Sequence, residues 1–162
     1  MSAGYTGKGG LIERLQGETA QALKAGDRRR ADALRLLIAA LKHERTQGAR
    51  HDLSPDEELA VLKRERKRRS EAATIYDEAG RPEQAAQERY EEELIAAYLP
   101  AELSDSELDR LVDETIAEVG ASSAREMGKV MGALMKKVAG RADGARVRAL
   151  VQARLGGDSQ RQ

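Results

Sequence analysis

Residues 104–157 decide the fold, and they read SDSELDRLVDETIAEVG, ASSAREMGKVMGALMKKVAG and RADGARVRALVQARLGG in succession. Each piece carries a helix-capping signal near its start and glycine at its end. Ser104 and Ser123 are each followed three positions later by Glu, which is the pattern of a capping box. Asp143 is a single capping residue. The stretch therefore predicts three consecutive helices joined by short turns.

The three predicted helices cover about 105–119, 124–139 and 144–155. Their apolar residues recur at the helical period, so one face of each helix can contribute to a common core. A bundle of about 50 residues can bury only a small core. The residues that would fill it are Leu108, Leu111, Val112, Ile116, Met127, Val130, Met131, Leu134, Val138, Val147, Leu150, Val151 and Leu155.

Upstream, the same signals predict four further helices, at about 11–25, 28–47, 55–79 and from Pro82 to the residue before Pro100. The last two are long and highly charged, which favours a projecting helical hairpin over a globule. The expected fold class is all-α, with N-terminal helices that include this hairpin followed by a small three-helix bundle. The expected organisation is a flexible tail (1–10), an N-terminal helical domain (11–99), the bundle (101–156) and a second flexible tail (157–162).

Composition excludes several classes of protein. The chain has 162 residues, 28 basic and 28 acidic side chains and no cysteine. It therefore forms no disulfide and no cysteine-ligated zinc site. No apolar run approaches the ~20 residues of a membrane span, so a soluble, cytoplasmic protein without membrane partners is expected. Zero net charge argues against a general nucleic-acid binder and against a DNA partner, so any RNA contact requires a local patch.

The charges are strongly segregated along the chain. Residues 101–119 carry seven acids and one base, whereas 125–162 carry nine bases and three acids. Residues 63–69 carry six bases and one acid, and 77–93 carry seven acids and two bases. The second half of the chain therefore offers an acidic helix followed by two basic ones.

The run 63–69 has two interpretations. The third and fourth helices could be joined by opposite charges, with Glu88, Glu91, Glu92 and Glu93 facing the cations and with Arg69 packed and paired. Alternatively, the cations on the far side of the helix, Lys63, Arg64 and Lys67, stay unpaired and meet phosphates. The sequence leaves both open.

The predicted sixth helix has three faces. Its apolar residues lie within ~60° of Met127, and the basic side chains of Arg125, Lys129 and Lys136 lie opposite. A strip of small residues, which includes Gly128 and Gly132, separates the two. Glycine inside a helix costs ~0.5–1 kcal/mol relative to alanine, so a steric reason is expected. Either a neighbouring helix packs closely there, or an RNA backbone approaches.

No catalytic or metal-binding motif is recognisable, so no cofactor, metal or catalytic residue is predicted. The two histidines, His43 and His51, lack the spacing of a zinc site and are expected on the surface. The many carboxylates lie on helices beside cations, and their spacing singles out no acid–base pair.

Three stretches carry a resemblance to a known family. They are RKRRSEAATIYDEAGR (66–81), EEELIAAYLPAELS (91–104) and the segment from Gly120 to Leu155. Together they resemble the YqeY family over nearly the whole chain. The C-terminal half is also similar to the tail of the GatB subunit of tRNA-dependent amidotransferase. The matching positions are Gly132, Met135, Lys136, Gly140, Ala142, Val147, Leu150 and Leu155.

In GatB the tail contacts tRNA, whereas a separate head, which this chain lacks, does the chemistry. The resemblance therefore implies a noncatalytic tRNA-binding or tRNA-associated module with a role in translation. The basic side chains expected to contact phosphate are Lys129, Lys136, Lys137, Arg141, Arg146 and Arg148. The glycines expected to allow close approach or to shape the turn are Gly128, Gly132, Gly140 and Gly144.

Two alternatives remain at this stage. First, the family resemblance also implies carbon–nitrogen ligase activity with glutamine as amido donor. The chain would then be an accessory part of the amidation of misacylated tRNA. The amidotransferase or an aminoacyl-tRNA synthetase would then be its protein partner. The other alternative is a protein–protein adaptor, since small helical bundles bind peptides in apolar grooves.

Overall fold

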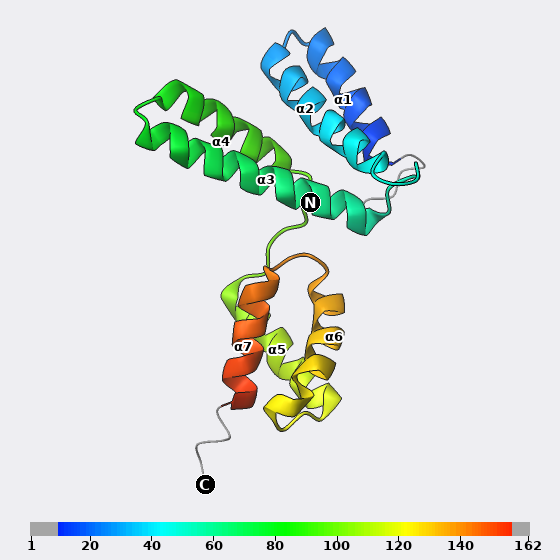
Figure 1. Ribbon diagram of the computed structural model, residues 1–162, viewed down its shortest axis with the longest axis vertical. Helices are drawn as coiled ribbons and strands as arrows, with labels where there is room; N and C mark the ends of the chain where they lie inside the picture. Colours follow the sequence, from blue (N-terminus) through cyan, green and yellow to red (C-terminus); the bar gives the residue numbers. More distant parts are fainter. Residues whose placement is uncertain (1–9, 157–162) are drawn as a thin grey trace. The chain divides into compact units, whose positions relative to one another are not determined.

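The computed structural model describes residues 10–156, which form seven α-helices and one 3₁₀ turn without any strand (Figure 1). This confirms the all-α prediction. The chain divides into two compact units, with the first ending at Leu99 and the second beginning at Pro100. The predicted flexible tails at 1–10 and 157–162 lie outside the described residues, apart from Gly10.

Unit 1 consists of two helical hairpins. Helix α1 (Leu11–Lys24) packs on α2 (Arg28–Arg45), and α3 (Pro55–Glu78) packs on α4 (Pro82–Ala96). The capping residues act as predicted. The Asp27 carboxylate accepts the N–H of Arg30 at 3.0 Å, and Ser54 and Glu57 form a reciprocal capping box. Packing of α2 against α3 and α4 joins the two hairpins around one apolar core.

Opposite charges join α3 to α4. The Arg69 Nε lies 2.7 Å from a carboxylate oxygen of Glu91 and 3.8 Å from one of Glu88. Arg69 also lies 3.5 Å from Glu65 on its own helix, and its side chain is 19% exposed. The predicted pairing across this hairpin is therefore confirmed for Glu88 and Glu91, as is the packed position of Arg69. Glu92 and Glu93 make no ion pair within the described residues.

Helix α4 ends earlier than the sequence predicts. Its last residue is Ala96, whereas Pro100 is the predicted stop. The N–H groups of Tyr98 and Leu99 donate to carbonyls three residues back, at 3.0 and 3.2 Å. The α conformation is disfavoured for the residue before proline, so the helix tightens into turns before it reaches Leu99.

Unit 2 is a three-helix bundle. It contains α5 (Asp105–Val119), the 3₁₀ turn η1 (Ala124–Glu126), α6 (Met127–Val138) and α7 (Gly144–Gly156), and each α-helix packs on the other two. All thirteen predicted core residues belong to its apolar cluster, eight of them buried and the other five partly buried. The cluster also contains the buried Leu103 and Ala142 and the partly buried Val119 and Ala121.

The predicted sixth helix, 124–139, is shorter as an α-helix. Its first turn is the 3₁₀ segment η1, and it ends at Val138 because Ala139 and Gly140 adopt left-handed φ values of 48° and 79°. Glycine adopts this conformation without the cost that a Cβ brings. Arg125 is exposed and lies in η1, directly before α6, rather than in the α-helix itself.

Candidate nucleic-acid interface

Helix α6 presents one buried and one open face. Val130, Leu134 and Val138 are each 0% exposed and point into the unit 2 core. Lys129 and Lys136 are exposed. They are seven residues apart, which leaves them about 20° from each other around the helix axis. The sequence-predicted lysines therefore share the solvent side of α6.

The two helical glycines of α6 face open space. Gly128 and Gly132 are exposed, and a Cβ built on either one would meet no neighbouring atom within 4 Å. Within the described chain, no neighbouring helix packs closely against them. The two positions still carry the cost of glycine in a helix. Of the two interpretations of these glycines, close packing of a neighbouring helix is therefore not seen within the described chain. The glycines instead leave a surface that another molecule can approach closely.

Three of the six predicted cations have neither an ion pair nor a side-chain hydrogen bond within residues 10–156, namely Lys129, Lys136 and Arg148. Arg148 is exposed on α7. Lys129 has an acidic neighbour, Glu126. The pKa of that carboxyl group is lowered, first because it accepts the Ser122 N–H and to a smaller degree because of Lys129. These three side chains are the least compensated positive charges of the predicted site.

Two other predicted cations pair with α5. Lys137 binds the carboxylate of Glu118, and Arg146 binds that of Asp105. Both contacts lie at the surface, where an ion pair contributes about 0–1 kcal/mol. The acidic helix thus compensates part of the basic stretch, including Lys137 of α6, and leaves Lys129 and Lys136 of that helix open.

Arg141 has a local structural role. Its guanidinium donates to the carbonyls of Lys137 and Val138, at 3.0 and 3.2 Å, and so caps the end of α6. Its own carbonyl accepts the N–H of Leu103 at 2.8 Å. Arg141 therefore holds the segment before α5 against the α6–α7 turn.

The predicted turn glycines also have local explanations. Gly140 has a positive φ, and Gly144 begins α7, where a Cβ would lie 4.0 Å from the Met135 methyl group. Asp143 caps α7, with its carboxylate oxygen 3.3 Å from the N–H of Arg146. These residues shape the turn between α6 and α7.

One cation that the sequence analysis did not single out is Arg154. Its Nε lies 2.7 Å from Asp113, and its Nη2 lies 3.1 Å from Asp109. The two aspartates are four residues apart on α5 and therefore lie on one side of that helix. The four-residue spacing of Asp109 and Asp113 is therefore the sequence signal that could have predicted one basic partner for both carboxylates.

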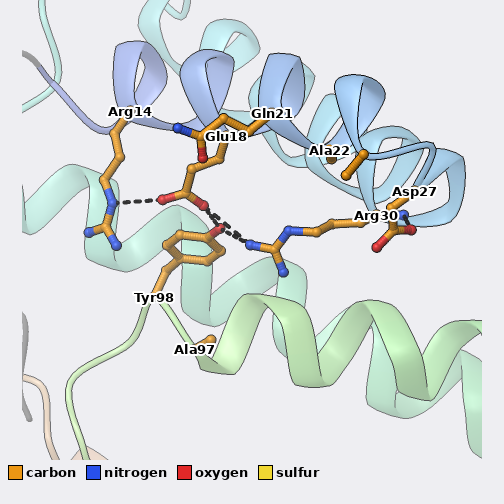
Figure 2. Close-up of a pocket in the computed structure, with 9 residues that line it drawn as sticks. Arg14, Glu18, Gln21, Ala22, Asp27, Arg30, Ala97 and Tyr98 are labelled. Carbon is orange, nitrogen blue, oxygen red and sulfur yellow. Dashed lines mark hydrogen bonds and ion pairs between the residues drawn. The ribbon is translucent and has the colours of Figure 1, made fainter.

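Unit 1 contains a separate polar pocket, shown in Figure 2. There the Glu18 carboxylate of α1 accepts from Arg14 at 3.0 Å, from Arg30 of α2 at 3.4 Å and from the hydroxyl of Tyr98. Burial, and then Glu18, raise the pKa of Tyr98. The cluster ties the segment after α4 to the first hairpin, because Tyr98 follows α4 directly. No local spacing in the sequence predicts this cluster, since Glu18 and Tyr98 are 80 residues apart.

The described residues contain neither a membrane-spanning helix nor a cluster of metal-binding side chains. No helix in 10–156 is long and apolar enough to cross a bilayer. No group of three or more histidine and carboxylate side chains in that range is arranged to hold a metal ion.

Comparison with known proteins identifies the family. The family model described as Yqey-like protein matches residues 12–155, which covers both units. No curated protein matches the chain. The chain belongs to the YqeY family.

Proposed function

We propose that this protein is a noncatalytic tRNA-binding module and that the open face of α6 contacts the RNA backbone. The observation that carries the proposal is the combination of Lys129 and Lys136, which have no ion pair in the described structure, with the open surface at Gly128 and Gly132. Lysines neutralise phosphates, and glycines leave room for the backbone to come close.

The class of RNA comes from the family. The C-terminal half of the chain resembles the GatB tail, which contacts tRNA, and Lys136 and Gly132 are among the matching positions. Phosphate contacts position an RNA without reading its sequence, so discrimination would depend on tRNA shape.

The proposed contacts form two groups. Lys129, Lys136 and Arg148 bind phosphate directly. Lys137 and Arg146 exchange an exposed carboxylate partner for phosphate, at little cost because such pairs are weak. We assign Arg141 to shaping the turn, since its guanidinium is already engaged by carbonyls.

The test is a titration of tRNA at several salt concentrations. The three direct phosphate contacts alone predict a roughly 40-fold fall in affinity between about 50 and about 200 mM salt. Lys129→Glu/Lys136→Glu should weaken binding at least about tenfold at low salt, because two contacts are lost and two repulsions are added. Lys24→Glu/Arg110→Glu is the matched control, since it changes the net charge equally at exposed positions on α1 and α5.

Equal affinity of the wild type and Lys129→Glu/Lys136→Glu would reject the α6 face. A separate assay addresses catalysis. The purified protein, incubated alone with misacylated tRNA and glutamine, should form no amidated product. Added to the amidotransferase, it should not increase the amount of amidated product that this enzyme forms. Product formed by the isolated protein would contradict a noncatalytic role.

A further inference from the structure

A polar groove of about 650 Å³ lies between α2 and α3 in unit 1. His43 and Gln47 line it from α2, and Arg64 and Arg68 line it from α3. These four side chains are exposed and carry N–H groups that can donate to an incoming acceptor. The groove is thus a donor-rich surface on a part of the chain that the proposed α6 face does not include.

The carboxylates of the groove are already engaged. Glu44 accepts from Arg64 at 2.9 Å, and Glu65 accepts from Arg68 at 3.0 Å. Glu65 is 5% exposed and also lies 3.5 Å from Arg69, so its charge is shared with a second guanidinium. Each of these hydrogen bonds uses one of the five N–H donors of its arginine. Donors therefore remain on Arg64 and Arg68, whose side chains are 43% and 63% exposed.

Further cations flank the groove on α3. Lys63 has no ion pair in the part of the chain that the structure describes, and Lys67 approaches Glu71 only at 3.9 Å. Together with Arg64 and Arg68 they cover an arc of about 140° around the helix axis and about 7.5 Å along it. The segment 63–69 carries six bases and one acid, and 42–50 adds Lys42, Arg45 and Arg50 against Glu44. Together the two segments carry nine bases and two acids, a local excess of seven positive charges.

Holding α3 against α4 does not require this excess. Arg69 contacts the α4 carboxylates of Glu88 and Glu91, and it does not line the groove. The pairs of Lys67 and Arg68, whose side chains are 78% and 63% exposed, lie within α3 and therefore do not hold α3 against α4. Crowded like charges repel one another, so the cluster needs an anionic partner to be favourable.

We propose that the α2–α3 groove is a second phosphate-binding surface for the RNA backbone. This inference rests on the proposed function and extends it to unit 1. Arg64 and Arg68 would grip phosphate oxygens through paired N–H groups, and Lys63 and Lys67 would neutralise the neighbouring phosphates. His43 and Gln47, whose side chains are 2.8 Å apart, would hydrogen-bond a phosphate or a 2′-hydroxyl group.

Two surfaces on one chain have a measurable consequence. When both engage the same RNA, the second contact is intramolecular, so the loss of either one lowers the affinity by a large factor. Each phosphate contact also adds about 0.7–0.9 to the slope of log affinity against log salt concentration. The slope therefore counts the contacts that each surface contributes.

The test compares Arg64→Gln/Arg68→Gln with Arg35→Gln/Arg110→Gln. The control removes two exposed arginines that, like Arg64 and Arg68, each have a carboxylate partner, Arg35 with Asp32 and Arg110 with Glu114. Both variants lower the net charge by two. Titrating labelled tRNA at about 50, 100 and 200 mM salt, we expect the groove variant to lose about five- to thirtyfold in affinity and about 1.5–2 in salt slope. The control should stay within about twofold of the wild type.

Lys63→Gln/Lys67→Gln provides a second groove variant, because neither lysine has a close carboxylate partner whose loss could disturb packing. If circular dichroism shows that Arg64→Gln/Arg68→Gln is unfolded, the tRNA affinity of Lys63→Gln/Lys67→Gln becomes the test of the groove. Groove variants that bind like the control would overturn this inference, while a loss confined to Lys129→Glu/Lys136→Glu would leave the proposed function intact. A wild-type protein that fails to bind tRNA at the lowest salt would overturn both.

Discussion

The two units place their charged residues differently. In unit 1, carboxylates enter the interior, where Glu58, Glu65 and Glu91 are 6%, 5% and 9% exposed. In unit 2, Thr115 is the one polar side chain among the buried residues of 100–156, and its hydroxyl donates to the Leu111 carbonyl at 2.7 Å. Charged side chains in unit 1 therefore lie both in the packed interior and at the surface, whereas those described in unit 2 lie at the surface.

This difference shows that a run of cations in the sequence does not have one meaning. Arg69 belongs to the most basic run of the chain, yet it is packed between carboxylates. Lys129 and Lys136 come from a less dense run, yet both are exposed and have no ion pair in the described structure. Mutations of charges should accordingly destabilise unit 1 and spare the stability of unit 2.

The largest expected effect tests the apolar core of unit 2. Leu134 is 0% exposed, so Leu134→Ala should lower the free energy of unfolding by about 2–5 kcal/mol through lost burial and the cavity left behind. Met135→Ala is the control, because Met135 is 37% exposed and its loss should cost about 0.5 kcal/mol or less. Urea denaturation measures both. Equal losses would mean that the α6 faces are assigned the wrong way round.

Arg69→Gln tests the charged interior of unit 1. Glu65, Glu88 and Glu91 would lose their shared cation, and we expect a loss of about 2–4 kcal/mol at neutral pH. Arg68→Gln, which changes a 63% exposed neighbour, should cost at most about 0.5 kcal/mol. Denaturation of both variants in urea checks the contrast, which two equally stable variants would contradict.

The same variant has an expected pH dependence. Burial, followed by repulsion from Glu91, raises the pKa of Glu88 above its usual 4.5, while Arg69 opposes the rise. A raised carboxyl pKa means that the folded state binds more protons, so this group reduces stability as pH rises from 4.5 through the folded pKa. Without Arg69 the pKa rises further. The defect of Arg69→Gln should therefore shrink as the pH is lowered toward 4.5, and a defect that grows on acidification would contradict the charge assignment.

A smaller effect is expected at the pocket of Figure 2. Tyr98→Phe removes the hydroxyl that donates to Glu18 and should destabilise unit 1 by about 1–2 kcal/mol. Tyr76→Phe serves as the control, since the half-buried Tyr76 hydroxyl makes no hydrogen bond in the described structure. Thermal unfolding of the two variants measures the difference. Indistinguishable midpoints would remove the pocket from the interactions that hold unit 1 together.

The smallest effect concerns His51 at the surface. Its pKa is raised above 6.5, first by the Ala49 carbonyl and then by Glu57, whose carboxylate lies 2.9 Å from Nε2. The contacts add stability that is complete below pH 6.5 and disappears as pH rises through the folded pKa. Glu57→Gln keeps the capping box and should move the pKa part of the way back, as followed by NMR titration of the His51 ring. An unchanged pKa would show that the carbonyl acts alone.

Helix boundaries were predictable where the capping side chain bonds a backbone N–H in the same turn of the chain. Ser54, Ser104 and Asp143 each satisfy an N–H within four residues, so the sequence next to them contains the necessary information. The α6 core face was predictable for the same reason, because Val130, Leu134 and Val138 recur at the helical period. The 3₁₀ start of that helix and the early end of α4 were not, since both depend on how a single turn tightens.

Charge pairing was only partly predictable. The Arg69 pairs follow from matching runs on neighbouring helices. Arg64 instead pairs with Glu44 of α2, which is 20 residues away and carries no matching run. Similarly, Lys137 and Arg146 find partners on α5 through the geometry of the bundle. Spacing along a sequence does not contain such distances, so the subset of cations left open could be identified only in the structure.

The central claim, that the open face of α6 binds tRNA, is tested most directly by residue-resolved NMR. Unlabelled tRNA would be titrated into ¹⁵N-labelled protein at low salt. We predict that the amide signals of Gly128, Lys129, Gly132 and Lys136 shift or broaden first in unit 2, while those of Arg110 and Glu114 on exposed α5 stay in place. Perturbation of α5 with unchanged Gly128 and Gly132 signals would contradict the claim.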